Sequence, residues 1–272
     1  MNRLKITTLD SLAVQERKLY LTAEKRLGPP YSIAREATIL LTTFVKSVAA
    51  DRFAFASFMA ILKKHQTLAL LSIVRFHHVQ AMMNFRQVLE SASSAAYALA
   101  NPNADYVDST TGLPMEPKKI SARSYAWIGS EFPQHSSELK DVKDSLNATT
   151  SHANLVESSR FVEAKFEEGF FGTAFFDQED NYLTKADLLT ITGGALTIMH
   201  LIWSVMQEHG GLVMADDWKQ RADRVASDRV RLLAATKATP RFEKAMEASA
   251  RADAARAAKR TGQDTKSTVV EG

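Results

Sequence analysis

Apolar residues recur every three or four positions along most of the chain, which is the spacing of helices that bury one side or more. This pattern predicts a first helix over residues 9–27, with Asp10 or Ser11 as its N-cap. The helix should end at residues 28–30 (GPP), because proline disfavours helical geometry in the residue before it. Ser32 is expected to cap a second helix.

The stretch from residue 51 to residue 100 contains no glycine or proline. It therefore predicts either one very long helix or two helices joined near residues 64–66 (KHQ). Residues 68–99 are apolar around much of the helix circumference, and so are residues 184–209. We expect these two helices to lie at the centre of the protein and to pack against each other.

Residues 101–119 contain three prolines and several turn formers, which predicts a loop. Two helices should follow, at about residues 121–131 and 136–157. The helical period then changes, because Phe and Val residues alternate loosely with polar ones around Glu168-Gly169. This change predicts a small β-hairpin at about residues 160–176.

Residues 188–207 (LLTITGGALTIMHLIWSVMQ) carry no formal charge and are long enough to span a bilayer. Threonine, histidine and a Gly-Gly pair dilute the hydrophobicity, however, and Lys185, Asp187 and Glu208 lie close to the two ends. The centre of a soluble bundle requires the same kind of helix. We therefore expect no membrane contact.

Together these elements predict a mainly α protein, a multi-helix bundle with long central helices and a small β-hairpin insertion. The core domain should span residues 1–212. Residues 213–260 form a basic C-terminal helical arm, since residues 215–260 hold twelve Lys and Arg against seven Asp and Glu. Residues 261–272 are expected to be a disordered tail.

Composition excludes several kinds of chemistry. The chain has no cysteine and its N-terminus does not look like a secretory signal, so we expect a cytoplasmic protein without disulfides or thiolate ligands. Nucleotide-binding glycine motifs, the G-x-S-x-G motif and helical zinc motifs are absent from the sequence. So is an arginine followed five to seven residues later by histidine, as in helical HEPN ribonucleases. The sequence predicts no cofactor and no metal.

Charged residues nevertheless occur within the predicted central helix. At about 100° per residue, Arg75, His78, Arg86 and Glu90 share one stripe with apolar residues. A buried charge needs a partner. Arg86 and Glu90 are one turn apart and can pair, whereas Arg75 has no opposite charge nearby. We infer that a distant segment supplies it.

The acidic segment FFDQEDNYLTKAD (residues 175–187) is the candidate partner, and three interpretations stay open. Its carboxylates could cap the following helix and complement its dipole. Asp177 or Asp180 could instead pair with Arg75 or Arg86 in a buried network. A site for a hard metal with His152 or Glu90 is the third. The candidate polar cluster comprises Arg75, His78, Arg86, Glu90, His152, Asn154, Asp177 and Asp180.

The basic arm is a second, weaker candidate. Its cations could contact nucleic-acid phosphates without reading bases. Acidic residues are interleaved with them, however, which favours a solvated helix or a partner helix. The residues concerned are Arg241, Lys244, Arg251, Arg256, Lys259 and Arg260.

Three blocks of sequence resemble a family of bacterial all-helical hypothetical proteins with no assigned activity. They are ALLSIVRFHHVQAMMNFRQVLESASSAAYALANP, SHAN and FFDQEDNYLTKADL. The resemblance covers about residues 51–207. It implies a bacterial or phage-borne, cytosolic origin, and no cofactor or catalytic residue.

Two functions remain open from the sequence. One is a soluble binding or interaction protein, in which the polar cluster is structural or lines a pocket for a small ligand or a protein partner. The alternative is a metal-dependent phosphoester or nucleic-acid-processing enzyme in a bacterial defence setting. A homodimer through the apolar helices is also left open. An enzyme site should be open to solvent, whereas a structural network should be closed.

Overall fold

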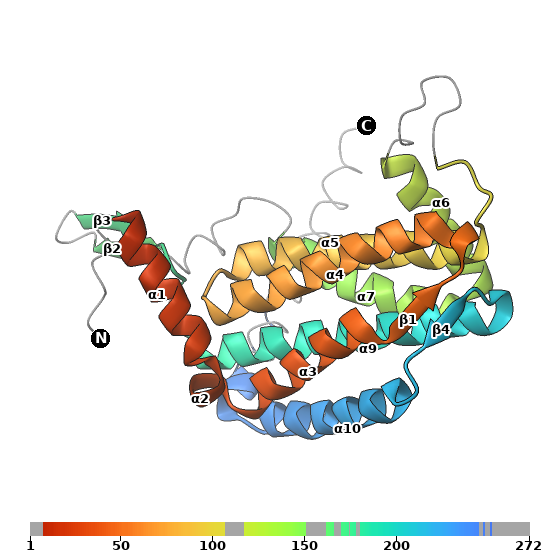
Figure 1. Cartoon of the computed structure of the whole chain (residues 1–272). Coiled ribbons are helices and arrows are strands. Elements are labelled where there is room, and N and C mark those ends of the chain that lie inside the picture. Colours follow the sequence, from red (N-terminus) through yellow and green to blue (C-terminus); the bar gives the residue numbers. More distant parts are fainter. Residues whose placement is uncertain are drawn as a thin grey trace, which may run out of the picture. The chain divides into compact units, whose positions relative to one another are not determined.

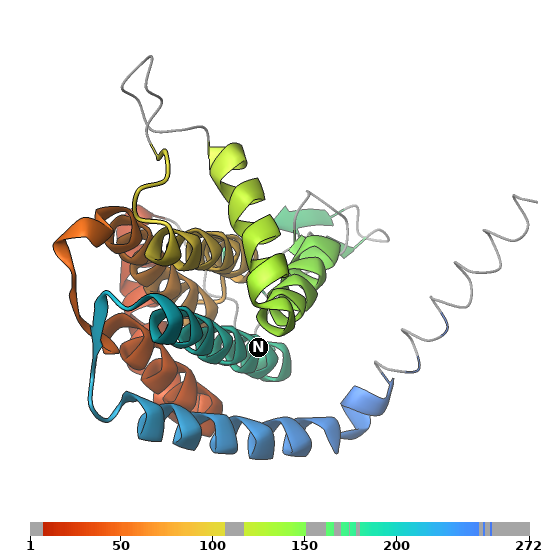
Figure 2. The same cartoon turned by 90° about the vertical axis from the view of Figure 1, so that its right-hand side faces the viewer.

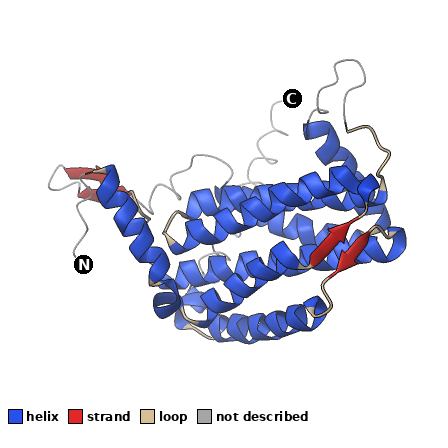
Figure 3. Cartoon of the chain, viewed as in Figure 1, coloured by secondary structure: helices blue, strands red, loops and turns tan. Residues whose placement is uncertain are grey.

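The computed structural model describes residues 8–106, 117–150, 162–165, 170–173, 175–177, 180–244, 247 and 251. Helices account for most of these residues, and two short antiparallel strand pairs account for the β-structure, as Figure 3 shows. The prediction of a mainly α bundle with a small β-insertion is confirmed.

Four long helices form the centre of the fold: α3 (Pro29–Thr43), α4 (Phe53–Val74), α5 (His78–Ala100) and α9 (Asn181–His209). In Figure 1, α4 and α5 lie side by side, and α3 and α9 run beneath them. As predicted, α5 packs against α9. The core between these helices includes Phe44, Phe55, Phe85, Leu40, Leu62 and Leu89, all fully buried.

The joint between α4 and α5 lies at residues 75–77, not near residues 64–66 as predicted. Phe76 adopts φ of 60°, the left-handed conformation that a bulky residue rarely takes. No glycine or proline marks this turn, so local sequence does not reveal it. Contacts from distant residues hold it: the backbone N–H of Asp177 donates to the Phe76 carbonyl at 2.9 Å, and the Arg26 guanidinium lies over the Phe76 ring.

The first helical segment covers residues 9–27 as predicted, but its division and its N-cap differ from the prediction. The first helix is divided into α1 (Leu9–Leu21) and α2 (Ala23–Leu27), and its N-cap is Thr8, which exchanges hydrogen bonds with Ser11. Helix α3 starts at Pro29 rather than at Ser32. Its two prolines occupy the first turn, where the missing N–H groups would have no helical partner.

One strand pair was not predicted. Strand β1 (Val45–Val48) pairs antiparallel with β4 (Leu212–Met214), and the short helix η1 (Ala50–Arg52) follows β1. The predicted hairpin is confirmed as β2 (Val162–Lys165) paired with β3 (Phe170–Thr173). Strands β1 and β4 are both too short to show an alternating pattern of apolar and polar residues, so the sequence does not predict that they pair.

Helices α6 (Pro117–Glu131) and α7 (Pro133–Thr150) cover another side of α5, and α7 also packs against α9. Figure 2 shows both of them next to these central helices. The buried side chains Ile128, Phe132 and Leu139 fix their positions.

Helix α9 is long and apolar enough to cross a membrane by length and composition, and 67% of its most apolar window is buried inside the protein. That burial is what a core helix requires. A Cβ atom at Gly194 would overlap the ring of Phe85, so glycine allows α5 and α9 to approach closely at this point.

The chain divides into two compact units, residues 1–229 and residues 230–272. The division falls within α10 (Trp218–Lys237), whereas the sequence placed the boundary after residue 212. The start of α10 belongs to the first unit because Trp218 is buried there against Phe44 and Trp203. In the second unit, Thr239 accepts a hydrogen bond from the backbone N–H of Phe242 and residues 240–244 are helical. The predicted tail lies outside the described residues.

Candidate functional site

The candidate polar residues fall into separate groups rather than into one cluster. Arg75 makes its ion pair with Glu16 of α1, with 3.4 Å between Nη1 and Oε2, and its Nε donates to the Leu71 carbonyl. The second carboxylate oxygen of Glu16 lies 2.9 Å from His77 Nε2. The distant counter-charge that the sequence required for Arg75 therefore exists, but it is Glu16 and not Asp177 or Asp180.

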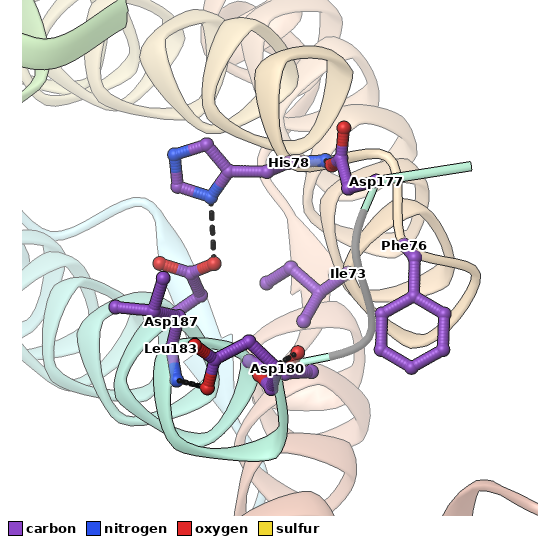
Figure 4. Close-up of a pocket in the computed structure, with 8 residues that line it drawn as sticks. Ile73, Phe76, His78, Asp177, Asp180, Leu183 and Asp187 are labelled. Atoms are coloured by element: carbon purple, nitrogen blue, oxygen red, sulfur yellow. Dashed lines mark hydrogen bonds and ion pairs between the residues drawn. The ribbon is translucent and has the colours of Figure 1, made fainter. Parts of the chain in front are cut away.

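His78 is the centre of a second group, which Figure 4 shows. Its Nδ1 lies 2.6 Å from Oδ2 of Asp187 on α9, and its backbone N–H donates to Asp177 at 2.6 Å. Asp177 thus holds the α4–α5 turn twice, through its own backbone N–H to Phe76 and through its carboxylate. These contacts tie the turn to α9 and to the segment before it.

The cavity beside His78 is small. Its volume is about 20 Å³, enough for about one water molecule. Asp180 also lines it, but its carboxylate caps α9 by accepting from the backbone N–H groups of Tyr182 and Leu183. We call Glu16, Arg75, His77, His78, Asp177 and Asp187 the polar junction.

Arg86 and Glu90 form a third group further along α5. The Nε of Arg86 lies 3.1 Å from Oε1 of Glu90, and the two side chains are 39% and 30% exposed. This is a half-exposed pair within one helix, not a buried network.

The other residues predicted for the polar cluster and for nucleic-acid binding are either outside the described residues or exposed. His152, Asn154, Arg256, Lys259 and Arg260 lie outside the described residues. Arg241, Lys244 and Arg251 are exposed. Among the residues that the structure describes, no group of three or more histidine and carboxylate side chains could hold a metal ion.

A larger hollow lies elsewhere, between α7, α9 and the middle of α10. It is open to solvent and has a volume of about 360 Å³, which is the size of a small-molecule site. We call this hollow the groove. Its lining residues are Gln134, His135, Glu138, Gly193, Leu196, Thr197, His200, Ser204, Ala226 and Arg229.

Helix periodicity explains why these residues face the groove. On α9, Gly193, Thr197, His200 and Ser204 follow a 4-3-4 spacing, which places them on one side of the helix. On α10, the buried residues Trp218, Ala222 and Val225 have the same spacing, and Arg229 is the next position along it. The packed face of α10 therefore carries Arg229 towards α9.

The Arg229 guanidinium lies directly against the backbone of α9. Its Nε donates to the Leu189 carbonyl at 2.8 Å, and a Cβ atom at Gly193 would overlap the guanidinium. Within the described part of the chain, Arg229 forms no ion pair. Burial lowers the pKa of Arg229, although an arginine stays protonated in a protein. The groove thus holds a cation that is not ion-paired with any of the described residues.

His135, Ser204 and Glu138 meet at the other end of the groove. Nε2 of His135 lies 3.2 Å from Oγ of Ser204, and Nδ1 of His135 lies 3.9 Å from Oε2 of Glu138. Burial lowers the pKa of His135; His200 acts in the same direction and Glu138 opposes it. The imidazole is therefore neutral at pH 7 and can accept a proton.

Sequence reasoning did not find the groove. The polar residues of α9 served only to argue against a membrane helix, and the absence of a helical zinc motif left His135 and His200 without a predicted role. The available signal was the 4-3-4 stripe of small and polar residues on α9. That stripe does not reveal its partners on α7 and α10, which are distant in sequence.

Comparisons of this chain with protein-family models, with curated proteins and with solved structures find no match. Function must therefore be argued from the geometry of the groove and the polar junction.

Proposed function

We propose that this protein binds a small molecule with an anionic group in the groove between α7, α9 and α10. One observation carries the proposal: Arg229 is partly buried against Gly193, has no ion pair in the described residues, and lines an open hollow of about 360 Å³. A partly buried cation gains most from an anion that enters the site, since charge-assisted hydrogen bonds are roughly twice as strong as neutral ones.

The rest of the lining supports a small molecule of mixed polarity. Leu196 and Ala226 supply apolar surface, while Gln134, Thr197 and His200 supply hydrogen-bonding groups. Gly193 and Ser204 are eleven residues apart on α9, which is about 16 Å at 1.5 Å per residue. An elongated ligand fits this arrangement, with its anionic group at Arg229.

A pair of probes of equal length tests the anionic preference. Octanoate should raise the melting temperature more than 1-octanol does, because only octanoate carries a charge for Arg229. In Arg229→Ala the affinity for octanoate should fall at least tenfold, since a hydrogen bond to a charged group contributes about 1.5–3 kcal/mol. Arg224→Ala is the matched control, because Arg224 is an exposed arginine on the same helix.

Equal shifts with the acid and the alcohol in the wild-type protein would contradict the proposal. Native mass spectrometry of protein purified from its host provides an independent check. It should detect a bound anionic compound in the wild-type protein and not in Arg229→Ala.

We also propose that the protein is soluble and cytoplasmic and that it belongs to the bacterial helical family that its sequence resembles. The burial of α9 among the other helices supports a soluble fold. Fractionation of host cells should place the protein in the soluble fraction, and recovery with membranes would count against this assignment.

A further inference from the structure

The hydroxyl of Ser204 differs in its partner from other hydroxyls of α9. Thr190 and Thr192 donate back to carbonyl groups of their own helix, four residues earlier. Ser204 lies instead within hydrogen-bonding distance of His135 on α7, with 3.2 Å between Oγ and Nε2. Its hydroxyl therefore points across the groove towards a base.

His135 is in turn placed between this hydroxyl and a carboxylate. When Nε2 accepts the Ser204 proton, Nδ1 carries the other hydrogen, and Oε2 of Glu138 lies 3.9 Å from Nδ1. Hydroxyl, imidazole and carboxylate in this order are the arrangement that activates a serine nucleophile, and such contacts are often long in the absence of substrate.

We propose that the groove is a hydrolytic site for esters that carry an anionic group, with Ser204 as the nucleophile and His135 as the general base. The inference rests on the proposed function, because Arg229 is assigned to the anionic end of the substrate. It goes further by placing the scissile bond at the other end of the groove.

The reaction balances with water as the only co-reactant. Ser204 Oγ attacks the carbonyl carbon while His135 Nε2 takes the hydroxyl proton. The bond to the leaving oxygen breaks, and His135 returns the proton to that oxygen, which releases an alcohol and leaves an ester on Ser204. A water molecule then attacks this ester and gives a proton to His135, and the carboxylic acid departs as Ser204 regains its proton.

The negative charge on the carbonyl oxygen needs a hydrogen-bond donor. Most backbone N–H groups of α9 are used within the helix, so a side chain must supply it. His200 lines the groove one turn before Ser204 on the same side of α9. Since one missing oxyanion donor costs about 10²–10³ in rate, a site that relies on one side chain should be a slow enzyme.

Covalent labelling of the full-length protein tests the nucleophile directly. An alkyl fluorophosphonate should form an Oγ–P bond at Ser204 with loss of fluoride, which intact-mass spectrometry and peptide mapping detect. Ser204→Ala should abolish labelling, and His135→Gln should slow it at least 100-fold. Ser57→Ala is the control, because Ser57 is a helical serine whose hydroxyl bonds to its own helix.

Turnover should show the contribution of the carboxylate. With the mono-4-nitrophenyl ester of a long-chain dicarboxylic acid as substrate, which can reach from Arg229 to Ser204, the rate should fall as the pH drops through the lowered pKa of His135. Glu138→Gln should reduce kcat about tenfold. It should also move the acidic limb of the pH–rate profile to lower pH, because Glu138 raises the pKa of His135, whereas burial and His200 lower it. Arg229 also lines the groove, but it is the same in the wild type and in Glu138→Gln, so it does not cause a difference between their pH–rate profiles. If Glu138 had only a structural role, the acidic limb of the pH–rate profile would not move.

The outcomes separate the two proposals. A folded protein that distinguishes octanoate from octanol but is not labelled at Ser204 overturns the hydrolytic inference and leaves the binding function in place. Labelling at Ser204 without an octanoate preference supports the nucleophile and overturns the anionic ligand. Labelling that persists in Ser204→Ala overturns the inference as well.

Discussion

The polar junction and the groove both gather charged and histidine side chains, but they differ in how those groups are satisfied. In the junction, Arg75 and His78 have carboxylate partners from distant segments, and the cavity beside His78 holds about 20 Å³. In the groove, Arg229 has no ion pair among the described residues and faces about 360 Å³. We therefore base the proposed binding site on the open groove and on Arg229, which has no ion pair among the described residues, and not on the density of charged side chains.

The largest effect that we expect is at the junction. Asp187→Ala removes the carboxylate that accepts from His78 Nδ1, and a hydrogen bond to a charged group contributes about 1.5–3 kcal/mol to the free energy of unfolding. Urea unfolding followed by tryptophan fluorescence measures this loss, since all three tryptophans lie in residues 1–229. Asp187→Asn keeps an acceptor and should lose less. If Asp187→Ala and Asp187→Asn were equally stable, the hydrogen bond to His78 would not be the source of the stability at this position.

Gly194→Ala should have the next largest effect. The added methyl group overlaps the fully buried ring of Phe85, and overpacking of a core costs about 1–3 kcal/mol. The gain in helix propensity offsets part of this, so the net loss should be about 1–2 kcal/mol. The same denaturation experiment measures it, and unchanged stability would show that α5 and α9 can separate without cost.

Gly193→Ala sharpens the comparison, because Gly193 lines the groove whereas Gly194 faces Phe85. Its methyl group meets the far end of the flexible Arg229 side chain, which can move away. The gain in helix propensity and the loss of the hydrogen bond from Arg229 to the Leu189 carbonyl oppose each other, so stability should stay within about 0.5 kcal/mol of wild type. The preference for octanoate over octanol should be lost, as the thermal-shift assay reports. Retained preference in this variant would indicate that the position of Arg229 is unimportant.

Arg86→Ala should have the smallest effect of the series. Its pair with Glu90 is half exposed, lies within one helix and has arginine at the N-terminal side, which is the weaker order. We expect a loss of about 0.3 kcal/mol in urea unfolding. A loss above about 1 kcal/mol would mean that this pair is part of a larger network, as the sequence first suggested.

Much of the fold was predictable from local pattern. The 3.6-residue period located the helices, and its loss around residues 160–176 located the hairpin. The α4–α5 joint was placed wrongly because the left-handed Phe76 is held by Asp177 and Arg26, which are distant in sequence. The β1–β4 pair was missed for the same reason, since each strand is short and depends on its partner.

The sequence by itself determined which segments are helical, which helices are buried, and that charges within them need partners, because these properties depend on neighbours within a few residues. Only the tertiary structure decided which partners they have: Glu16 for Arg75, Asp187 for His78, and no ion pair for Arg229 among the described residues. A pairing energy depends on the distance between two side chains, and the packing of helices from distant parts of the chain sets that distance.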